Sequence, residues 1–325
     1  MRIVVIRFSS IGDIVLTSPV VRCIKKKYPW AKLAYVTKKS FAPLVQHNPH
    51  IDDFFYLEED LKPLIAEIKA WKPDFIVDLH HNLRTFLIKR QVSCPSGSFP
   101  KLNVQKFLKV NFGINCLPDL HIVDRYFFAM EKIGVNNDEL GLEMHLPKDI
   151  RLPESLPPKF IAVAVGAQFA TKTYPQNLMA EALKNLPLPI VLLGGKQEAA
   201  KADFIEKNLS GQEVYQWCGK TDLIQSAAVV QMAQLLITHD TGLMHIGAAF
   251  KRKMVSLWGN TIPEFGMYAY YGSAHQVESV ALEVKGLSCR PCSKIGHAKC
   301  PKKHFKCMND IKPAQVQKAV LQLLD

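Results

Sequence analysis

The first acidic residue of the sequence is Asp13. It ends the segment S-S-I-G-D at residues 9–13, which is rich in small residues and follows an apolar stretch. Ser10 and Gly12 would let the backbone pass close to a bound molecule. An aspartate at the start of a helix often serves only as a cap, which is worth about 0.5–2 kcal/mol. The alternative is a general base that takes a proton from an incoming hydroxyl and accelerates the reaction by ~10²–10⁴. Taken alone, the run favours the cap.

A second polar loop covers residues 165–175, V-G-A-Q-F-A-T-K-T-Y-P. An apolar stretch ends at Gly166, and Pro175 suits the first position of a helix. Loop N–H groups and Lys172 at the end of a strand can hold a diphosphate. Because the G-x-x-x-x-G-K pattern of a P-loop is missing, an ordinary loop with one exposed lysine is the simpler interpretation of this segment by itself.

A third segment, I-T-H-D-T-G-L-M-H-I-G-A-A at residues 237–249, runs from an apolar strand pattern into small residues. Thr241 and Gly242 would present backbone N–H groups at a helix N-terminus, where phosphates bind readily. Asp240 either caps this helix or holds the lysine of a facing loop. His245 lies one turn further along the same face, and its role stays open between a structural side chain and a phosphate contact.

Cysteines and histidines gather near the C-terminus: Cys289, Cys292, Cys300, Cys307, His297 and His304. Four such cysteines in a cytosolic protein are typical of a tetrahedral Cys₄ zinc site of structural kind, with the histidines as alternative ligands. The other interpretation, which we prefer, is a set of reduced cysteines that pack a C-terminal loop. No D-x-D pair indicates a metal-dependent reaction.

The elements that must position these residues alternate between strand and helix. Short β-branched strand patterns occupy residues 2–7, 32–37, 53–57 and 74–79, with helical patterns to about residue 28 and over 61–71 and 121–133. Residues 146–159 carry four prolines and read as a linker. The alternation then resumes, with strands at 160–165, 189–193, 213–217, 234–238 and 254–257 and helices at 176–185, 196–208 and 312–324.

This alternation predicts an α/β protein with two Rossmann-like domains that face each other across a cleft. We expect an N-terminal domain at residues 1–150 and a C-terminal domain at 151–310. The helix within 311–325 could pack back on the N-terminal domain. The carboxyl ends of both sheets, where open α/β folds bind ligands, would line the cleft.

Composition narrows the class of protein further. The chain of 325 residues has a formal charge of +12, and acids are absent from residues 79–118 and 284–309, which are rich in lysine and arginine. Such stretches attract nucleic acid, an anionic membrane surface or an acidic substrate. The sequence lacks a membrane-spanning pattern, a secretory signal and the cysteine density of a disulfide scaffold. We therefore expect a cytoplasmic protein.

Five motifs, in order along the chain, resemble glycosyltransferase family 9, the bacterial heptosyltransferases of the lipopolysaccharide inner core. They are S-S-I-G-D at 9–13, D-L-H-H-N-L-R at 78–84, K-T-Y-P at 172–175, D-T-G-L-M-H at 240–245 and L-W-G-N-T-I-P at 257–263. The resemblance implies a GT-B fold, an ADP-heptose donor, inversion at the anomeric carbon and no catalytic cofactor. It also implies an acceptor of the lipid A–Kdo type, and hence peripheral contact with the anionic inner face of the cytoplasmic membrane and no nucleic acid.

On this resemblance Asp13 matches the general base that deprotonates the acceptor hydroxyl, and Lys172 matches the lysine that stabilises the leaving ADP. The remaining implied donor contacts are Gly166, Thr171, Glu198, Asp240, Thr241, Gly242 and His245. The implied acceptor contacts are Ser10, Gly12, Arg84 and Arg125.

Three alternatives stay open. A nucleotide-sugar epimerase could share the fold, but it would not need the acid-free stretch near Arg84. A zinc-containing nucleic-acid-binding protein would interleave aromatics with the C-terminal lysines, where only Phe305 occurs. A family member that only binds the sugar nucleotide would not need both Asp13 and Lys172. Residues 264–267, E-F-G-M, depart from the Gly-Pro that is common in the family, so the donor sugar stays open.

Overall fold

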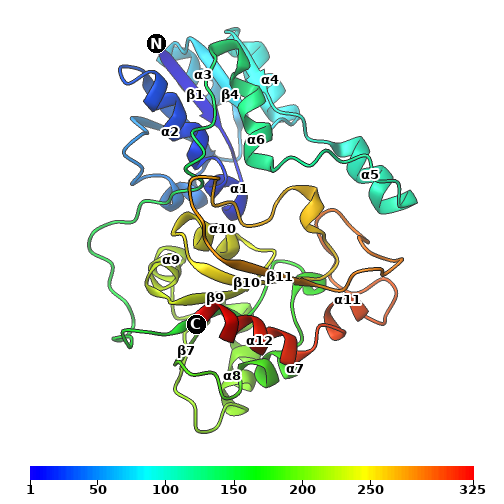
Figure 1. The fold of residues 1–325 in the computed structure, drawn as a ribbon. Helices are drawn as coiled ribbons and strands as arrows, with labels where there is room; N and C mark the ends of the chain where they lie inside the picture. Colours follow the sequence, from blue (N-terminus) through cyan, green and yellow to red (C-terminus); the bar gives the residue numbers. More distant parts are fainter. The chain divides into compact units, whose positions relative to one another are not determined.

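The computed structural model describes residues 1–325 and contains two parallel sheets with helices around them, shown in Figure 1. The chain divides into two compact units, which are described separately below. The first unit comprises residues 1–102, 120–147 and 270–275, and the second comprises 103–119, 148–269 and 276–325. Two parallel α/β sheets confirm the predicted fold class. The units are not continuous in sequence, because residues 103–119 group with the second unit and 270–275 with the first.

The sheet of the first unit has five parallel strands in the order β3-β2-β1-β4-β5. The strands are β1 Arg2–Ile6, β2 Lys32–Lys38, β3 Asp53–Leu57, β4 Phe75–Asp78 and β5 Ser96–Ser98. Ile3 of β1 lies opposite Leu33 on one side and Phe75 on the other. These three residues are almost completely buried, as expected of central strands in a parallel sheet with helices on both faces.

Helices of the first unit start at polar caps and bury an apolar stripe. They are α1 Ile11–Val15, α2 Ser18–Lys27, α3 Leu61–Trp71, α4 Leu83–Val92 and α6 Ile122–Phe127, with 3₁₀ turns at Lys39–Leu44 and Phe128–Ile133. Asp60 caps α3 by accepting the N–H of Lys62. Leu64 and Ile68, one turn apart on α3, then pack into the core of this unit.

The sheet of the second unit has six parallel strands in the order β11-β10-β9-β6-β7-β8. They are β6 Ile161–Ala164, β7 Ile190–Leu193, β8 Val214–Gln216, β9 Leu235–His239, β10 Lys253–Trp258 and β11 Ser279–Glu283. Ile161 pairs with Ile190 of β7 and with Leu235 of β9, so β6 lies inside the sheet although it comes first in the sequence of this unit.

Helices of the second unit are α5 Asn103–Phe112, α7 Gln176–Leu183, α8 Ala199–Lys207, α9 Leu223–Met232, α10 Gly242–Ala249, α11 Lys306–Asn309 and α12 Pro313–Leu324. Short 3₁₀ turns occur at Ala170–Lys172, Lys196–Glu198 and Pro263–Phe265. No helix of the chain is both long and apolar enough to span a membrane.

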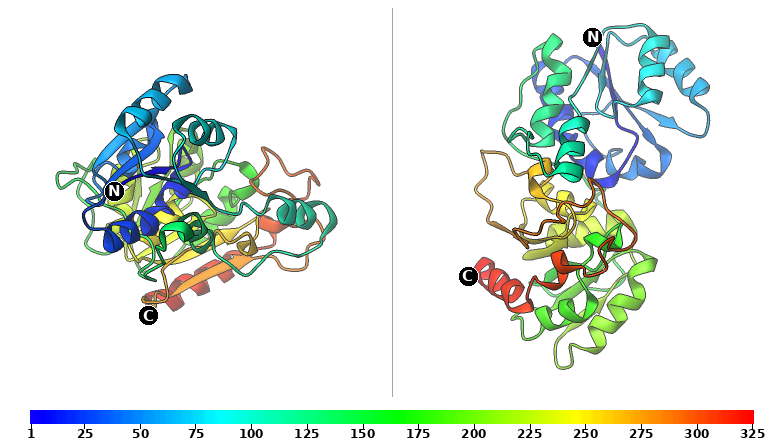
Figure 2. Two further views of the ribbon diagram at one scale, coloured as in Figure 1. Left: turned by 90° about the horizontal axis from the view of Figure 1, so that it is seen from above. Right: turned by 90° about the vertical axis from the view of Figure 1, so that its right-hand side faces the viewer.

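The C-terminal helix α12 is the one element whose expected partner differs. It packs against α7, β10 and β11 of the second unit, instead of the N-terminal domain that we considered from the sequence; Figure 2 shows it (red) beside β11 (orange). Val316, Val320 and Leu323 of α12 enter the core of the second unit. Their spacing gives the helix one apolar face, and this sheet is the surface that buries it.

Candidate functional site

In each sheet the first strand has neighbours on both sides, and the chain connections on its two sides run in opposite directions across the sheet. In the first unit β1 lies between β2 and β4, and in the second unit β6 lies between β7 and β9. Ligands of open α/β sheets bind outside the carboxyl ends of the strands at such a switch point. The loops after these strands carry most of the residues that the sequence singled out, so each unit has a candidate half-site.

In the first unit the carboxylate of Asp13 is held from two sides. Its Oδ1 lies 2.6 Å from Nη2 of Arg7, which follows β1 directly. Its Oδ2 accepts the hydroxyl of Ser10 at 2.9 Å and the backbone N–H of Ser10 at 3.3 Å. The contact with the Ser10 N–H matches a capping box, so the structural role that we weighed is present. The same contacts fix the carboxylate at the carboxyl end of β1.

The charge state of Asp13 follows from these contacts. Burial acts to raise the pKa of this carboxyl, but the positive charge of Arg7 and the hydrogen bonds from Ser10 outweigh it, and the pKa lies below its ordinary value. Asp13 is therefore ionised at neutral pH. Its side chain keeps 22% of its surface exposed, against 10% for Arg7, so the carboxylate is the more accessible member of the pair.

The end of the neighbouring strand β4 is closed by a second buried carboxylate. Asp78 accepts the backbone N–H groups of His80 and His81 and forms an ion pair of 2.8 Å with Lys89. Burial, together with the charge of Arg7, lowers the pKa of His80 to about 4, so this ring is neutral at physiological pH. The ring lies 4.9 Å from that of Phe8. This motif therefore builds a rigid wall beside the loop that carries Asp13.

The two arginines that we expected at an acceptor lie in different surroundings. Arg84 is exposed near the start of α4, beside the exposed side chains of Leu83 and Phe86. Arg125, on α6, has only 1% of its surface exposed. In this arrangement Arg84 can meet a large anionic molecule from solvent, whereas Arg125 is enclosed. Their contact with an acceptor stays a prediction.

In the second unit Lys172 and Asp240 come together from separate loops. Nζ of Lys172, after β6, lies 2.6 Å from Oδ2 of Asp240, which follows β9. The same oxygen accepts the hydroxyl of Thr261 at 2.7 Å. Both charged side chains are mostly buried, with 15% and 12% of their surfaces exposed. Of the two alternatives left open for Asp240, the geometry therefore shows that it holds the lysine of the facing loop.

Backbone groups beside this ion pair suit an anion. Helix α10 begins at Gly242, after Thr241 in extended conformation, so its first N–H groups have no partner within the helix. Asp240 precedes this terminus in the sequence. Lys172 lies near it in space, through its ion pair with Asp240. His245 lies on the first turn, but its side chain is almost completely buried, which agrees with a structural role in this arrangement.

Glu198 and Gly166 meet at the carboxyl ends of β7 and β6. A Cβ atom on Gly166 would lie 2.4 Å from Cγ of Glu198, so a larger residue would displace the glutamate. Oε2 of Glu198 accepts the N–H of Gly195 at 2.9 Å. The glycine is therefore required for the close approach of these two loops. The remaining expected donor residue, Thr171, is buried and exchanges hydrogen bonds with the backbone of His297.

The model of glycosyltransferase family 9 (heptosyltransferase) matches residues 65–298 of the chain. The chain belongs to this family. It is 26% identical to lipooligosaccharide heptosyltransferase 2 of Campylobacter jejuni over 97% of this chain and 95% of that protein. It is 23% identical to lipopolysaccharide heptosyltransferase 2 of Escherichia coli over 82% and 84% of the two chains. The chain is therefore a glycosyltransferase of the heptosyltransferase type that belongs to lipopolysaccharide biosynthesis.

Solved structures agree with this fold. The transferase superposes on the family 9 glycosyltransferase of Veillonella parvula with a TM-score of 0.77 at 23% identity, covering 99% of this chain and 97% of that one. For the E. coli ADP-heptose lps heptosyltransferase II the TM-score is 0.72 at 19% identity, with 100% and 98% covered. The GT-B fold class is thus confirmed, and the family replaces the epimerase and nucleic-acid-binding alternatives.

The cysteine cluster of the transferase lies in the second unit, at residues 289–307. Its four sulfurs do not form a set of three or more ligand atoms within 4.8 Å of one another, and all four cysteines are free. Cys289 Sγ lies 3.7 Å from Nε2 of His304. Burial raises the pKa of Cys307 to about 11, and the nearby thiols of Cys292 and Cys300 act in the same direction. Both the structural zinc site and the packing role of these cysteines stay predictions.

Two functional neighbours were missed from the sequence. Arg7 ends the first strand and holds Asp13, and Thr261 follows β10 and holds Asp240. Arg7 carried a signal, because a charged residue at the end of a buried strand needs a partner. Thr261 lay within the motif at 257–263, but nothing in that motif indicated its contact with Asp240.

Proposed function

We propose that the chain transfers a heptose from ADP-heptose to an anionic acceptor of the lipopolysaccharide inner core, with inversion at the anomeric carbon and without a catalytic cofactor. The observation that carries the proposal is the oriented, ionised carboxylate of Asp13 at the switch point of the first sheet. Family membership supplies the reaction class, and the relatives are named for lipopolysaccharide or lipooligosaccharide.

The proposed chemistry is a single displacement. The acceptor hydroxyl oxygen attacks the anomeric carbon while the bond from that carbon to the β-phosphate oxygen breaks, and ADP leaves with the electron pair. Asp13 accepts the proton of the hydroxyl as the new bond forms. Attack on the face opposite the leaving group inverts the configuration. A carboxylate with a lowered pKa is a weak base, so it accepts the proton late, when the attacking oxygen has become positive.

The proposed donor site lies in the second unit. The departing ADP gains one negative charge beyond those that its diphosphate carries in the donor, and Lys172 with the first N–H groups of α10 supplies positive charge beside it. Glu198, at the end of β7, is proposed to contact the nucleoside. The ion pair with Asp240 holds Lys172 in place before a ligand binds. A lysine held in this way loses less conformational freedom when it binds the diphosphate.

The proposed acceptor surface includes the acid-free segment. Helix α5 has no buried residue, and Val104 and Phe107, three residues apart, expose 67% and 56% of their surfaces. Lys106 and Lys109 lie on the same helix. Exposed apolar side chains beside lysines are typical of helices that lie at the surface of an anionic membrane. We therefore propose a cytoplasmic protein that contacts the inner membrane peripherally through this helix.

The transfer is tested by incubating the chain with ADP-heptose and a Kdo-bearing lipid A acceptor and determining the anomeric configuration of the product by NMR. We expect a glycosylated product of inverted configuration and equimolar ADP. ADP-glucose in place of ADP-heptose is the matched control for the sugar. Retention of configuration would overturn the displacement, and ADP release that does not depend on acceptor would show hydrolysis of the donor in place of transfer.

Membrane contact is tested by co-sedimentation with vesicles of phosphatidylcholine, with and without phosphatidylglycerol. Binding should require the anionic lipid, weaken with salt, and be lost in Val104→Ser/Phe107→Ser. Phe204→Ser, at an exposed phenylalanine of α8, is the matched control and should bind like the wild type. Equal binding of the α5 double variant would move the contact away from this helix.

A further inference from the structure

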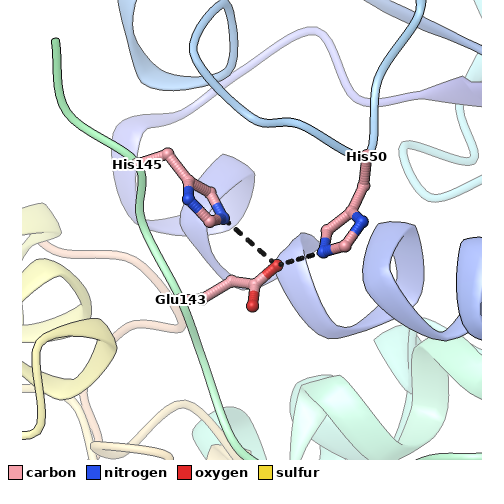
Figure 3. Close-up of side chains that lie close together, drawn as sticks. All are labelled: His50, Glu143 and His145. Atoms are coloured by element: carbon pink, nitrogen blue, oxygen red, sulfur yellow. Dashed lines mark ion pairs between the residues drawn. The ribbon is translucent and has the colours of Figure 1, made fainter.

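A cluster of two histidines and one glutamate lies apart from the residues of the proposed reaction. His50 comes from the loop before β3, and Glu143 and His145 come from the segment after the 3₁₀ turn Phe128–Ile133. Figure 3 shows both imidazole rings directed at the same carboxylate. One ligand atom of each residue lies within 4.8 Å of those of the other two. All three belong to the first unit.

The separations in this cluster exceed those of direct hydrogen bonds. Oε1 of Glu143 lies 3.4 Å from Nε2 of His145 and 3.6 Å from Nε2 of His50. An N–H···O hydrogen bond has a length of about 2.7–3.2 Å. Two ligands bound at about 2.0–2.1 Å to one tetrahedral ion lie roughly 3.3–3.4 Å apart. The observed distances are thus close to those of atoms that share a cation.

Two of these atoms are buried without a hydrogen-bond partner. Oε1 of Glu143 and Nε2 of His145 have almost no exposed surface, and their only polar neighbours are each other, at 3.4 Å, and His50, without a hydrogen bond of normal geometry. A buried polar atom that lacks a partner costs about 1–3 kcal/mol. A cation between the three residues would satisfy both atoms at once.

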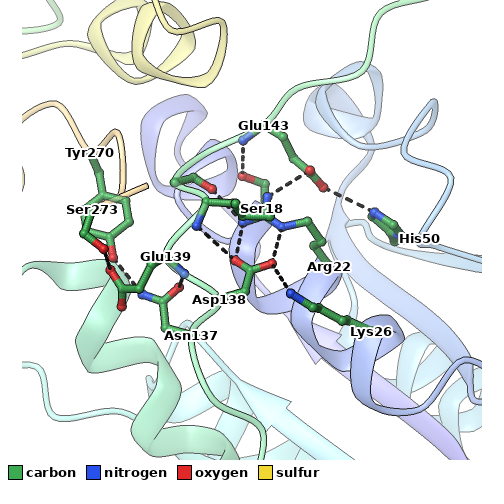
Figure 4. A network of polar contacts seen from close by, with 12 residues as sticks. Ser18, Arg22, Lys26, His50, Asn137, Asp138, Glu139, Glu143, Tyr270 and Ser273 are labelled. Carbon is green, nitrogen blue, oxygen red and sulfur yellow. Dashed lines mark hydrogen bonds and ion pairs between the residues drawn. The ribbon is translucent and has the colours of Figure 1, made fainter. Parts of the chain in front are cut away.

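The carboxylate of Glu143 is oriented by neighbours that leave Oε1 available. Its other oxygen, Oε2, accepts Nη1 of Arg22 at 2.9 Å, and its backbone N–H donates to Ser18 Oγ at 3.0 Å. Asp138 binds the same guanidinium through two contacts of 2.8 and 3.0 Å and so balances its charge, as Figure 4 shows. Outer partners that fix a ligand in this way are a regular feature of metal sites.

We propose that His50, Glu143 and His145 bind one divalent transition-metal ion, of which Zn²⁺ is the best match. Two imidazoles and one carboxylate suit zinc and neighbouring metals of similar softness, and Ca²⁺ or Mg²⁺ would require more oxygen ligands. No fourth side chain joins this set, so water would have to be the remaining ligand. The ion links the loop at residue 50 to the chain segment that leads out of the first unit. Its role is structural, because none of the three residues belongs to the proposed reaction.

The experiment uses the full chain, stripped with chelator and labelled with ¹⁵N-histidine, titrated with ZnCl₂. The imidazole resonances of His50 and His145, assigned by their loss in His50→Ala and His145→Ala, should shift on zinc addition. This readout separates the site from zinc at the cysteine cluster, which would move only His297 or His304. Loss of an outer partner alone costs a metal site roughly 10–100-fold in affinity, so His145→Ala should lower the affinity of this site by at least that much.

Two variants keep the test decisive. Glu143→Gln preserves the shape of the side chain and should also weaken zinc binding, even if His145→Ala fails to fold. His47→Ala, at an exposed histidine three residues from His50, should bind zinc like the wild type. Unmoved His50 and His145 resonances at excess ZnCl₂, or unchanged affinity in Glu143→Gln, would overturn the proposal. Neither result depends on transferase activity, so the proposed function stands or falls separately.

Discussion

Each sheet has an ion pair between a basic and an acidic side chain at its switch point. The two pairs differ in which further groups hold them and in how accessible their members are. In the first unit Arg7 donates to the backbone oxygens of Ser9 and Leu79 as well as to Asp13, and Asp13 also accepts two hydrogen bonds from Ser10. In the second unit the carboxylate is fixed, because Asp240 accepts Thr261 as well as Lys172. Asp13 is clearly the more exposed member of its pair, at 22% against 10% for Arg7, whereas Lys172 and Asp240 are almost equally buried, at 15% and 12%.

This difference indicates which side chain of each pair is available to a substrate. The anchored partner sets position and charge, and the more exposed partner keeps the surface that a ligand can reach. A carboxylate suits proton transfer, and a lysine suits a diphosphate. The pair of the first unit therefore fits chemistry on the acceptor, and the pair of the second unit fits donor binding. Substitutions on the two sides should therefore have different kinetic signatures.

The largest effect is expected from Asp13→Ala. Loss of the proposed base should lower kcat by ~10²–10⁴, while the affinity for ADP stays unchanged because the donor residues lie in the other unit. Steady-state transfer kinetics and calorimetric ADP titration measure the two quantities. An Asp13→Ala enzyme with nearly normal kcat would reduce this residue to its capping role.

Lys172→Ala, in the second unit, should weaken donor binding. A hydrogen bond to a charged group is worth about 1.5–3 kcal/mol, so the affinity for ADP should fall roughly 10–100-fold. Calorimetry with ADP provides the measurement, and Lys207→Ala, at an exposed lysine at the end of α8, is the matched control. If both variants bound ADP like the wild type, the donor diphosphate would have to lie elsewhere.

Arg7→Gln should change the pH dependence more than the maximal rate. The charge of Arg7 helps to hold the pKa of Asp13 below its ordinary value, so its removal raises that pKa. The base is then protonated at higher pH, and the acidic limb of kcat/KM moves upward. Arg2→Gln, at the other end of β1, is the control. A general loss of stability would scale the whole profile without moving its acidic limb.

The smallest effect is expected from Thr261→Val, which removes the hydroxyl that holds Asp240 and nearly preserves the volume. A hydrogen bond to a charged group is worth about 1.5–3 kcal/mol, but Thr261 acts on ADP only through Asp240 and Lys172, so ADP affinity should fall by about 2–10-fold. The acidic limb of the pH profile should not move, in contrast to Arg7→Gln. An upward shift of that limb in Thr261→Val would contradict the independence of the two pairs.

Strands were easier to predict than the segments between them. The predicted bounds of β3 and α3 coincide with the structure, because an apolar period between polar caps determines both ends. The predicted helix at 121–133 is instead α6 followed by a 3₁₀ turn. Strand β11 and helix α4 were not among the predicted ranges. Helix α5 and the short strand β5 were also missed, since α5 buries no side chain and β5 consists of S-G-S. Neither carries the periodicity of a buried element.

The sequence alone determined the α/β class, the two parallel sheets and the loops that carry Asp13, Lys172 and Asp240, because local apolar patterns and short motifs are properties of neighbouring residues. Only the tertiary structure decided which charges meet. Arg7 finds Asp13 across a turn, Lys172 finds Asp240 from a loop 68 residues away, and His50 faces Glu143 from a different part of the first unit. Strand order sets these encounters, and a local pattern carries no record of strand order.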